Sequence, residues 1–170
     1  MTSDRYLDLS RGEADIALRS GEPEDPNLVG RKVADSIWAV FASPAYVEKY
    51  GRPTSPADLS RHRLVAFEGA MQRHRANAWL AAVAPDAEIV ARNASVLGVL
   101  LSVKAGVGIA ALPATIAEAE GLVEVLPPIA ELARGWYLLT HPDLRRQSRI
   151  AAFFDHIVSE LPALRTALGG

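Results

Sequence analysis

The stretch ARNASVLGVLLSVKAGVGIAALP, residues 91–113, decides the fold. Ser95 is a good N-cap, and the apolar residues of 95–105 recur at helical spacing. Gly106 suits the position just past the end of that helix. The apolar run 107–112 is typical of a short strand that is buried on both faces. The stretch therefore predicts a helix that leads directly into a central strand.

Further elements are predicted on both sides of this stretch. Strands are expected at 14–19, 28–33, 36–42, 63–67, 88–91, 122–126 and 134–140, and helices at 45–50, 113–120 and 148–164. Residues 69–87 show no clear pattern. Because strands and helices alternate through most of the chain, we expect an α/β fold with a largely parallel sheet.

Composition limits the class of protein. The 170 residues suffice for one domain or two small lobes, and 49% hydrophobic with 22% charged residues is ordinary for a globular chain. The absence of cysteine excludes disulfides and thiolate metal sites. A net charge of −2 gives no attraction to nucleic acid or to an anionic membrane. No apolar run approaches the ~20 residues of a membrane span, and the first residues lack the apolar core of a signal peptide, so we expect a cytoplasmic protein.

The sequence contains no recognisable catalytic set. No G-x-S-x-G motif or paired carboxylates are found, and the histidines have no nearby carboxylate pair that would complete a metal site. Residues 106–111 match G-x-G-x-x-A, but a helix precedes these glycines, whereas a dinucleotide site needs a strand there. We therefore expect no enzyme activity, no metal and no cofactor.

Several segments together carry a resemblance to a known family. They are DLSRGEADIALRSG (8–21), FASPAYVEKYGRPTSPADLSRHRLV (41–65), the stretch 91–113 and GLVEVLPP (121–128). In this order and spacing they resemble the effector-binding domain of LysR-type bacterial transcriptional regulators. The resemblance covers nearly the whole chain, from about Asp4 to Leu161.

The resemblance implies the type 2 periplasmic-binding-protein fold, in which two Rossmann-like lobes are joined by crossing strands and a small ligand binds in the cleft. Residues 4–42 with 141–166 would form the first lobe, and 43–140 the second lobe with the crossings. The family's domain opens with a βαβ unit ahead of the segment that begins at Asp8, so the first lobe is expected to be incomplete. Apolar surface should then be exposed at 16–18, at 37–41 and on the last long helix at Phe153 and Ile157.

The function implied is that of a small-molecule sensor. Closure or rotation of the lobes on effector binding would bias a homodimer or higher oligomer of the intact protein. In the family, a winged helix-turn-helix ahead of this domain contacts DNA, so DNA binding is assigned to no residue of this chain. A solute-binding protein that uses the same fold for transport is the alternative.

The candidate ligand residues lie at strand ends and at one helix start. Asn93, Ser95 and Val96 begin the predicted helix 95–105, whose N–H groups can hold a carboxylate. Simple N-capping explains Asn93 and Ser95 equally well. Arg19 and Ser20 follow a strand, where Arg19 can bind an acid or simply lie on the surface. Phe67 is a candidate aromatic pocket wall, although core packing is the default for such a residue. These residues suggest a polar or anionic effector.

Overall fold

The computed structural model of the chain describes residues 8–23 and 25–168. The chain forms two compact units, one made of Met1–Ser36 with Arg134–Gly170 and the other of Ile37–Ala133. We call them the terminal unit and the central unit. The boundaries expected from the sequence, at 42 and 140, lie further along the chain than these.

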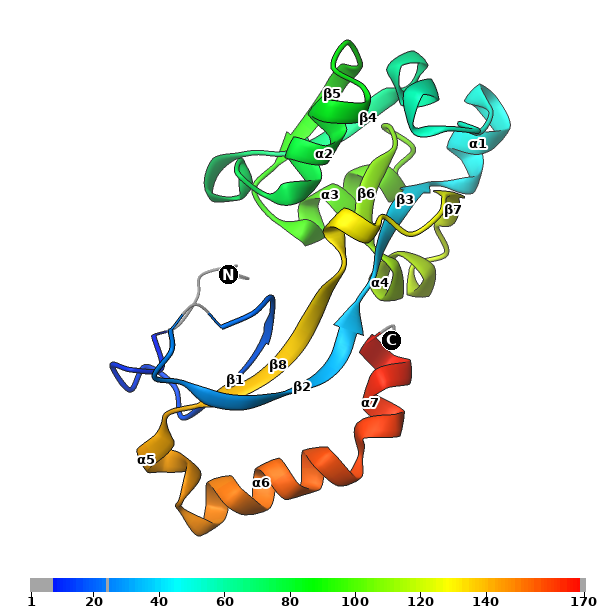
Figure 1. The fold of residues 1–170 in the computed structure, drawn as a ribbon. Coiled ribbons are helices and arrows are strands. Elements are labelled where there is room, and N and C mark those ends of the chain that lie inside the picture. Colours follow the sequence, from blue (N-terminus) through cyan, green and yellow to red (C-terminus); the bar gives the residue numbers. More distant parts are fainter. Residues whose placement is uncertain (1–7, 24, 169–170) are drawn as a thin grey trace. The chain divides into compact units, whose positions relative to one another are not determined.

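The central unit is built on two strand groups that meet at Ile109 (Figure 1). Strands β4 (Arg63–Phe67) and β5 (Glu88–Asn93) pair in parallel, whereas β3 (Trp38–Ala42) lies between β6 (Ala110–Pro113) and β7 (Val123–Leu126) and is antiparallel to both. The backbone of Ile109 donates to the Arg63 carbonyl over 2.8 Å and accepts from the Val65 N–H over 2.9 Å. These bonds join β4 to β6, so the strands follow the order β5-β4-β6-β3-β7.

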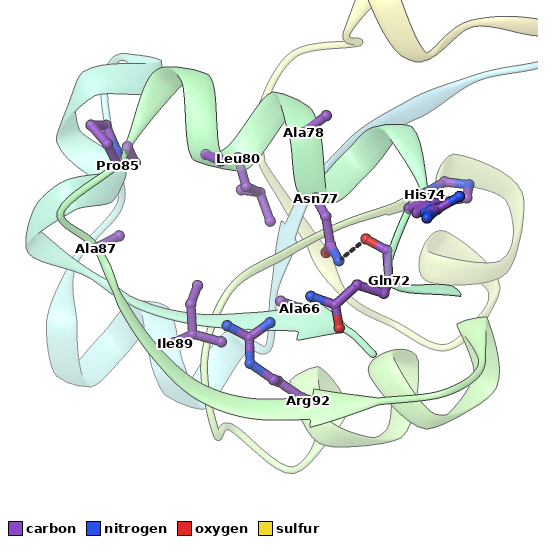
Figure 2. Close-up of a pocket in the computed structure, with 13 residues that line it drawn as sticks. Ala66, Gln72, His74, Asn77, Ala78, Leu80, Pro85, Ala87, Ile89 and Arg92 are labelled. Atoms are coloured by element: carbon purple, nitrogen blue, oxygen red, sulfur yellow. Dashed lines mark hydrogen bonds between the residues drawn. The ribbon is translucent and has the colours of Figure 1, made fainter. Parts of the chain in front are cut away.

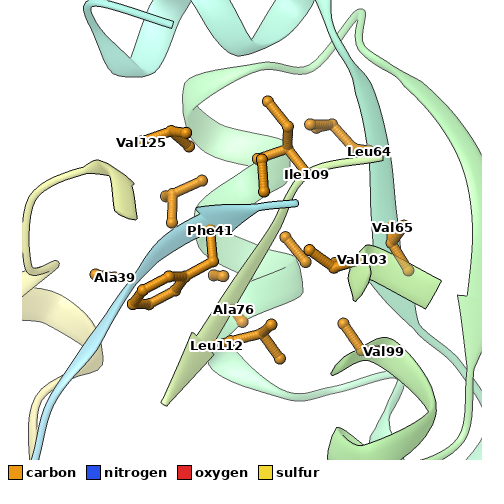
Figure 3. Close-up of a cluster of buried hydrophobic side chains, with 14 of the residues drawn as sticks. Ala39, Phe41, Leu64, Val65, Ala76, Val99, Val103, Ile109, Leu112 and Val125 are labelled. Carbon is orange, nitrogen blue, oxygen red and sulfur yellow. The ribbon is translucent and has the colours of Figure 1, made fainter. Parts of the chain in front are cut away.

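Short helices surround these strands. They are α1 (Pro44–Tyr50), α2 (Arg75–Val83), α3 (Val96–Lys104) and α4 (Ala114–Ala119), with 3-10 turns at Pro56–Arg61, Gly69–Met71 and Ala130–Leu132. The predicted start and end of α3 are confirmed: Ser95 caps it, and Gly106 follows it with a φ of 75°. The core is apolar, and in Figure 3 the fully buried Phe41, Val103 and Leu112 lie within it.

Helix α2 is the longest element that the sequence did not indicate. Its N-cap is His74, whose Nδ1 accepts from the Ala76 N–H over 3.2 Å. Histidine is not among the usual N-cap residues, so the start of the helix carried no recognisable signal. The helix is also rich in alanine, which blurs the contrast between its buried and exposed faces.

The terminal unit is a three-stranded antiparallel sheet with helices. Its strands β1 (Ile16–Ser20), β8 (Arg134–Thr140) and β2 (Val29–Ser36) lie in that order, and α5 (Pro142–Arg145), α6 (Ser148–Ser159) and α7 (Leu161–Leu168) follow β8. Buried side chains of strands and helices form one cluster, made of Val33, Leu138, Ile150, Phe154 and Leu161. The helices therefore cover one face of this sheet.

Two expectations about secondary structure are wrong. The sheets are mainly antiparallel, because β3 and β8 each run antiparallel to both of their neighbours. The expected helix 148–164 ends at Ser159, and α7 begins at Leu161. Pro162 lacks an N–H and its ring clashes with the preceding turn, so one continuous helix is disfavoured.

The expectation of exposed apolar surface is confirmed in part. Leu18 of β1 is 46% exposed and Phe153 of α6 is 43% exposed. Ile157 is half-buried. The expectation is wrong for Trp38–Ala42, which is buried throughout because β3 is the middle strand of its sheet and its side chains pack into the core of the central unit.

Candidate functional site

The start of α3 carries hydrogen-bond donors that the described part of the chain does not use. The Ser95 Oγ accepts from the Gly98 N–H over 3.1 Å, and the Ser95 carbonyl accepts from the Val99 N–H over 3.1 Å. The N–H groups of Val96 and Leu97 have no partner among the described residues. Such N–H groups, at the positive end of a helix of nine residues, favour a bound anion.

Asn93 supports this helix with its side chain. Its Nδ2 donates to the Ser102 Oγ over 3.0 Å. Gly98 leaves room for it, since a Cβ at Gly98 would lie 3.0 Å from the Asn93 Cβ and Oδ1. The backbone carbonyl of Asn93 accepts from the Glu68 N–H over 2.9 Å and so ties the end of β5 to the end of β4. The side chain of Asn93 thus contacts α3 at Ser102, near the end of the helix, while Ser95 is the N-cap.

Phe67 lies opposite Asn93 in the parallel pair and is 2% exposed. Its ring centroid is 5.0 Å from that of His74 and 6.4 Å from that of Trp38. The ring belongs to the core of the central unit, and the half-buried His74 lies between it and the surface.

Arg19 and Ser20 lie in the terminal unit, at the end of β1. They pair with Tyr137 and Trp136 of β8, and both are half-buried. Asn93, Ser95 and Val96 therefore lie together in the central unit, with Phe67 on the neighbouring strand, whereas Arg19 and Ser20 belong to the terminal unit.

A pocket of about 430 Å³ lies between α2 and the strand pair β4–β5 (Figure 2). Ala66 of β4 and Arg92 of β5 line it, and these residues are direct neighbours across the two strands. Because side chains alternate along a strand, Arg92 faces α2 while Asn93 faces α3. The pocket and the start of α3 thus lie on opposite faces of the same strand pair.

Asn77 of α2 holds the end of β4 with its side chain amide. The Oδ1 accepts from the Phe67 N–H over 2.9 Å, and the Nδ2 donates to the carbonyls of Phe67 and Gln72 over 2.8 and 3.0 Å. The amide thus makes the hydrogen bonds to Phe67 that the backbone of a neighbouring strand would otherwise make. Neither Asn77 nor Arg92 was among the candidate residues predicted from the sequence. The one signal available for Asn77 was that a polar asparagine stands within an otherwise apolar segment.

A second polar contact, partly buried, lies near the start of β4. The Tyr46 hydroxyl accepts from the Arg63 N–H over 3.1 Å and lies 3.3 Å from the His62 Nδ1. Burial raises the pKa of Tyr46 and lowers the pKa of His62, although the negative charge of Asp58 opposes the latter effect. Either the Tyr46 hydroxyl or the His62 Nδ1 donates in this contact, according to the tautomer of His62, and the contact links the turn before β4 to α1.

Metal sites and membrane spans are not found in the part of the chain that the structure describes. It contains no group of three or more His, Cys, Asp or Glu side chains that could hold a metal ion. None of its helices is both long enough and apolar enough to cross a membrane.

Comparison with known proteins identifies the family. The model of the LysR substrate binding domain matches residues 1–162. Over 61 residues the chain is 53% identical to an HTH-type transcriptional regulator of Xanthomonas campestris, a match that covers 36% of this chain and 18% of that protein. Over 172 residues it is 28% identical to LtrA of Klebsiella pneumoniae, a probable HTH-type transcriptional regulator, covering 95% of this chain and 55% of LtrA. The chain thus spans about half the length of LtrA.

Solved structures agree with this assignment. The regulatory domain of CrgA from Neisseria meningitidis, a LysR-type transcriptional regulator, matches with a TM-score of 0.70 at 28% identity, covering 94% of this chain and 81% of that one. Full-length AphB from Vibrio cholerae matches with a TM-score of 0.68 at 19% identity, covering 94% of this chain and 56% of AphB, and shows the fold alone. The expected type 2 periplasmic-binding-protein fold is confirmed by these neighbours. The chain therefore belongs to the LysR substrate-binding domain family.

Proposed function

We propose that this chain is the effector-sensing part of a LysR-type transcriptional regulator and that a small polar or anionic effector binds at the start of α3. The family and the names of the relatives support the regulatory role. Contact with DNA and assembly into a homodimer or higher oligomer are proposed for the longer protein of which such a domain forms a part. A cytoplasmic location belongs to the same proposal, since a regulator meets DNA there.

The observation that carries the binding site is a set of three donors at the helix start. They are the N–H groups of Val96 and Leu97 and the hydroxyl of Ser95, whose hydrogen has no acceptor among the described residues. Leu97 is 49% exposed, so a ligand can approach from solvent. Donors of this kind hold a carboxylate without any change in the helix.

The remaining candidates have different roles in this proposal. Asn93 positions the helix through Ser102 and need not touch the ligand. Phe67 supports the region from within the core. Arg19 and Ser20, at the end of β1, are proposed as further ligand contacts, and their alternative remains a surface or structural role.

The alternative function in transport is not favoured. The Xanthomonas campestris protein, LtrA and CrgA are all named as transcriptional regulators. These names support a sensor that acts in gene regulation rather than a carrier of solutes.

The proposed site can be tested by removing a single N–H group. Val96 is the first residue of α3, where proline is tolerated because that N–H makes no bond within the helix. Ser95, with φ −148° and ψ 155°, already has the extended conformation that a residue before proline prefers. Val96→Pro should therefore remove one donor and leave the fold intact.

The assay measures thermal stabilisation by a panel of small mono- and dicarboxylates and their neutral amides. Acids that stabilise the parent chain should lose about tenfold in affinity in Val96→Pro, since a hydrogen bond to a charged group contributes about 1.5–3 kcal/mol. Val96→Ala, which retains the N–H, is the matched control and should bind as the parent chain does. Equal binding of acids by Val96→Pro and Val96→Ala would contradict the proposed site.

A further inference from the structure

The pocket between α2 and the strand pair β4–β5 combines an apolar lining with two polar side chains that the described part of the chain leaves without partners. These are Gln72 and Arg92, whose side chains are directed toward the same part of the pocket in Figure 2. Arg73 also lines the pocket, and none of the lining residues is acidic. The charge of the lining is thus positive, which favours an anion.

Asn77 is not available to a ligand, although it lies in the lining. Its amide already makes three hydrogen bonds, to the backbone of Phe67 and of Gln72. Those bonds fix the turn that carries Gln72 and Arg73 against α2. The backbone at the polar end of the pocket is therefore held in place, while the side chains of Gln72, Arg73 and Arg92 are exposed to solvent.

The other end of the pocket is lined by apolar side chains, most of them alanine. Leu80, Ala84 and Ala66 are each only 4% exposed. Ala81 and Ala87 also contribute to the lining, and Pro85 and Ile89 complete it. Because alanine side chains end at Cβ, they leave the space between the helix and the strands open. This lining suits a compact hydrocarbon body rather than a sugar or a nucleotide.

We propose that this pocket binds small monocarboxylates with a compact apolar body. The guanidinium group of Arg92 pairs with the carboxylate, for which its two parallel N–H donors are well suited, and the Gln72 amide donates a further hydrogen bond. The hydrocarbon body lies over the alanines of α2 and displaces water from them. This site is separate from the start of α3, since the two lie on opposite faces of the strand pair.

The test uses cyclohexanecarboxylate as the probe and cyclohexanecarboxamide as its uncharged control. The protein is prepared with isotope labels in its alanine methyl groups. It is then titrated with each probe, and the methyl signals are followed by NMR. The acid is expected to shift the methyl signals of Ala66, Ala81 and Ala84 in a saturable way, and the amide is expected to bind about tenfold more weakly because it lacks the charge that pairs with Arg92. Equal binding of the acid and the amide would overturn the proposal.

Three variants locate the binding site. Arg92→Gln should weaken binding of the acid about tenfold by removing the charged partner. Ala81→Leu should abolish binding by filling the pocket, whereas Ala82→Leu, the same change one position along α2 outside the lining, should have no effect. Both alanines are exposed and leucine is a good helix former, so both variants should fold. An unchanged affinity in Ala81→Leu would refute the assignment.

A fourth variant separates this proposal from the proposed effector site. Val96→Pro changes only the start of α3 and should leave binding of cyclohexanecarboxylate at this pocket unaffected. If the acid instead loses affinity in Val96→Pro and keeps it in Arg92→Gln, the probe occupies the α3 site, and the pocket proposal fails while the effector site stands.

Discussion

Replacement of Asn77 by alanine should destabilise the central unit more than any other truncation of a side-chain amide on α2 or on the turn before it. The side chain makes three hydrogen bonds of 2.8–3.0 Å to the backbone of Phe67 and Gln72. A net contribution of about 1 kcal/mol for each bond gives about 3 kcal/mol. Alanine regains roughly 0.5 kcal/mol through its higher helix propensity. The free energy of unfolding should therefore fall by about 2.5 kcal/mol.

The assay is urea unfolding followed by tryptophan fluorescence in a Trp136→Phe background. Trp38 and Trp79 then report on the central unit alone. Gln72→Ala is the matched control, because it also truncates an amide but removes no side-chain hydrogen bond within the described residues. It should cost less than about 0.5 kcal/mol, as exposed substitutions usually do.

A charge variant at the same position tests the direction of the bonds. Asn77→Asp keeps an acceptor for the Phe67 N–H but places a second carboxylate oxygen against the carbonyls of Phe67 and Gln72. It should therefore be at least as unstable as Asn77→Ala at neutral pH and regain stability at acidic pH, where a protonated carboxyl can donate. A loss below about 1 kcal/mol in Asn77→Ala, or no recovery of Asn77→Asp in acid, would refute the reasoning.

Three further predictions concern other parts of the chain. Burial lowers the pKa of His62 from its usual 6.5. The stability that the neutral imidazole contributes is therefore present above pH 6.5 and is lost as the pH falls through the folded-state pKa. His62→Gln should reduce this dependence of the free energy of unfolding on pH, measured by urea titrations at several pH values. Gly108→Ala should cost about 1–3 kcal/mol, measured by urea unfolding, since its Cβ would lie 2.5 Å from the Arg63 carbonyl oxygen. Leu18→Lys and Phe153→Lys, at positions 46% and 43% exposed, should reduce self-association in sedimentation velocity, and unchanged association would show that these side chains do not mediate it.

Local signals accounted for much of the fold. The helix α3 was predicted because Ser95 can cap it, apolar residues recur through it and Gly106 can adopt a positive φ just past its end. The family resemblance rested on segments of this kind in a fixed order, and the family match over residues 1–162 agrees with it. Capping, periodicity and glycine conformation depend on residues that are close in the sequence, so the sequence is sufficient to reveal them.

Strand direction and the geometry of the pocket depended on contacts between distant residues. The antiparallel pairing of β3 and β8 with both neighbours cannot be read from the residues of either strand, because apolar strands of both kinds look alike. The hydrogen bonds of Asn77 and the place of Arg92 in the pocket lining became visible only once α2 lay over β4 and β5. By itself the sequence determined the family, the principal helix and its capping residues. Only the tertiary structure decided which polar side chains are used within the fold and which remain available to a ligand, since that depends on the partners that folding brings together.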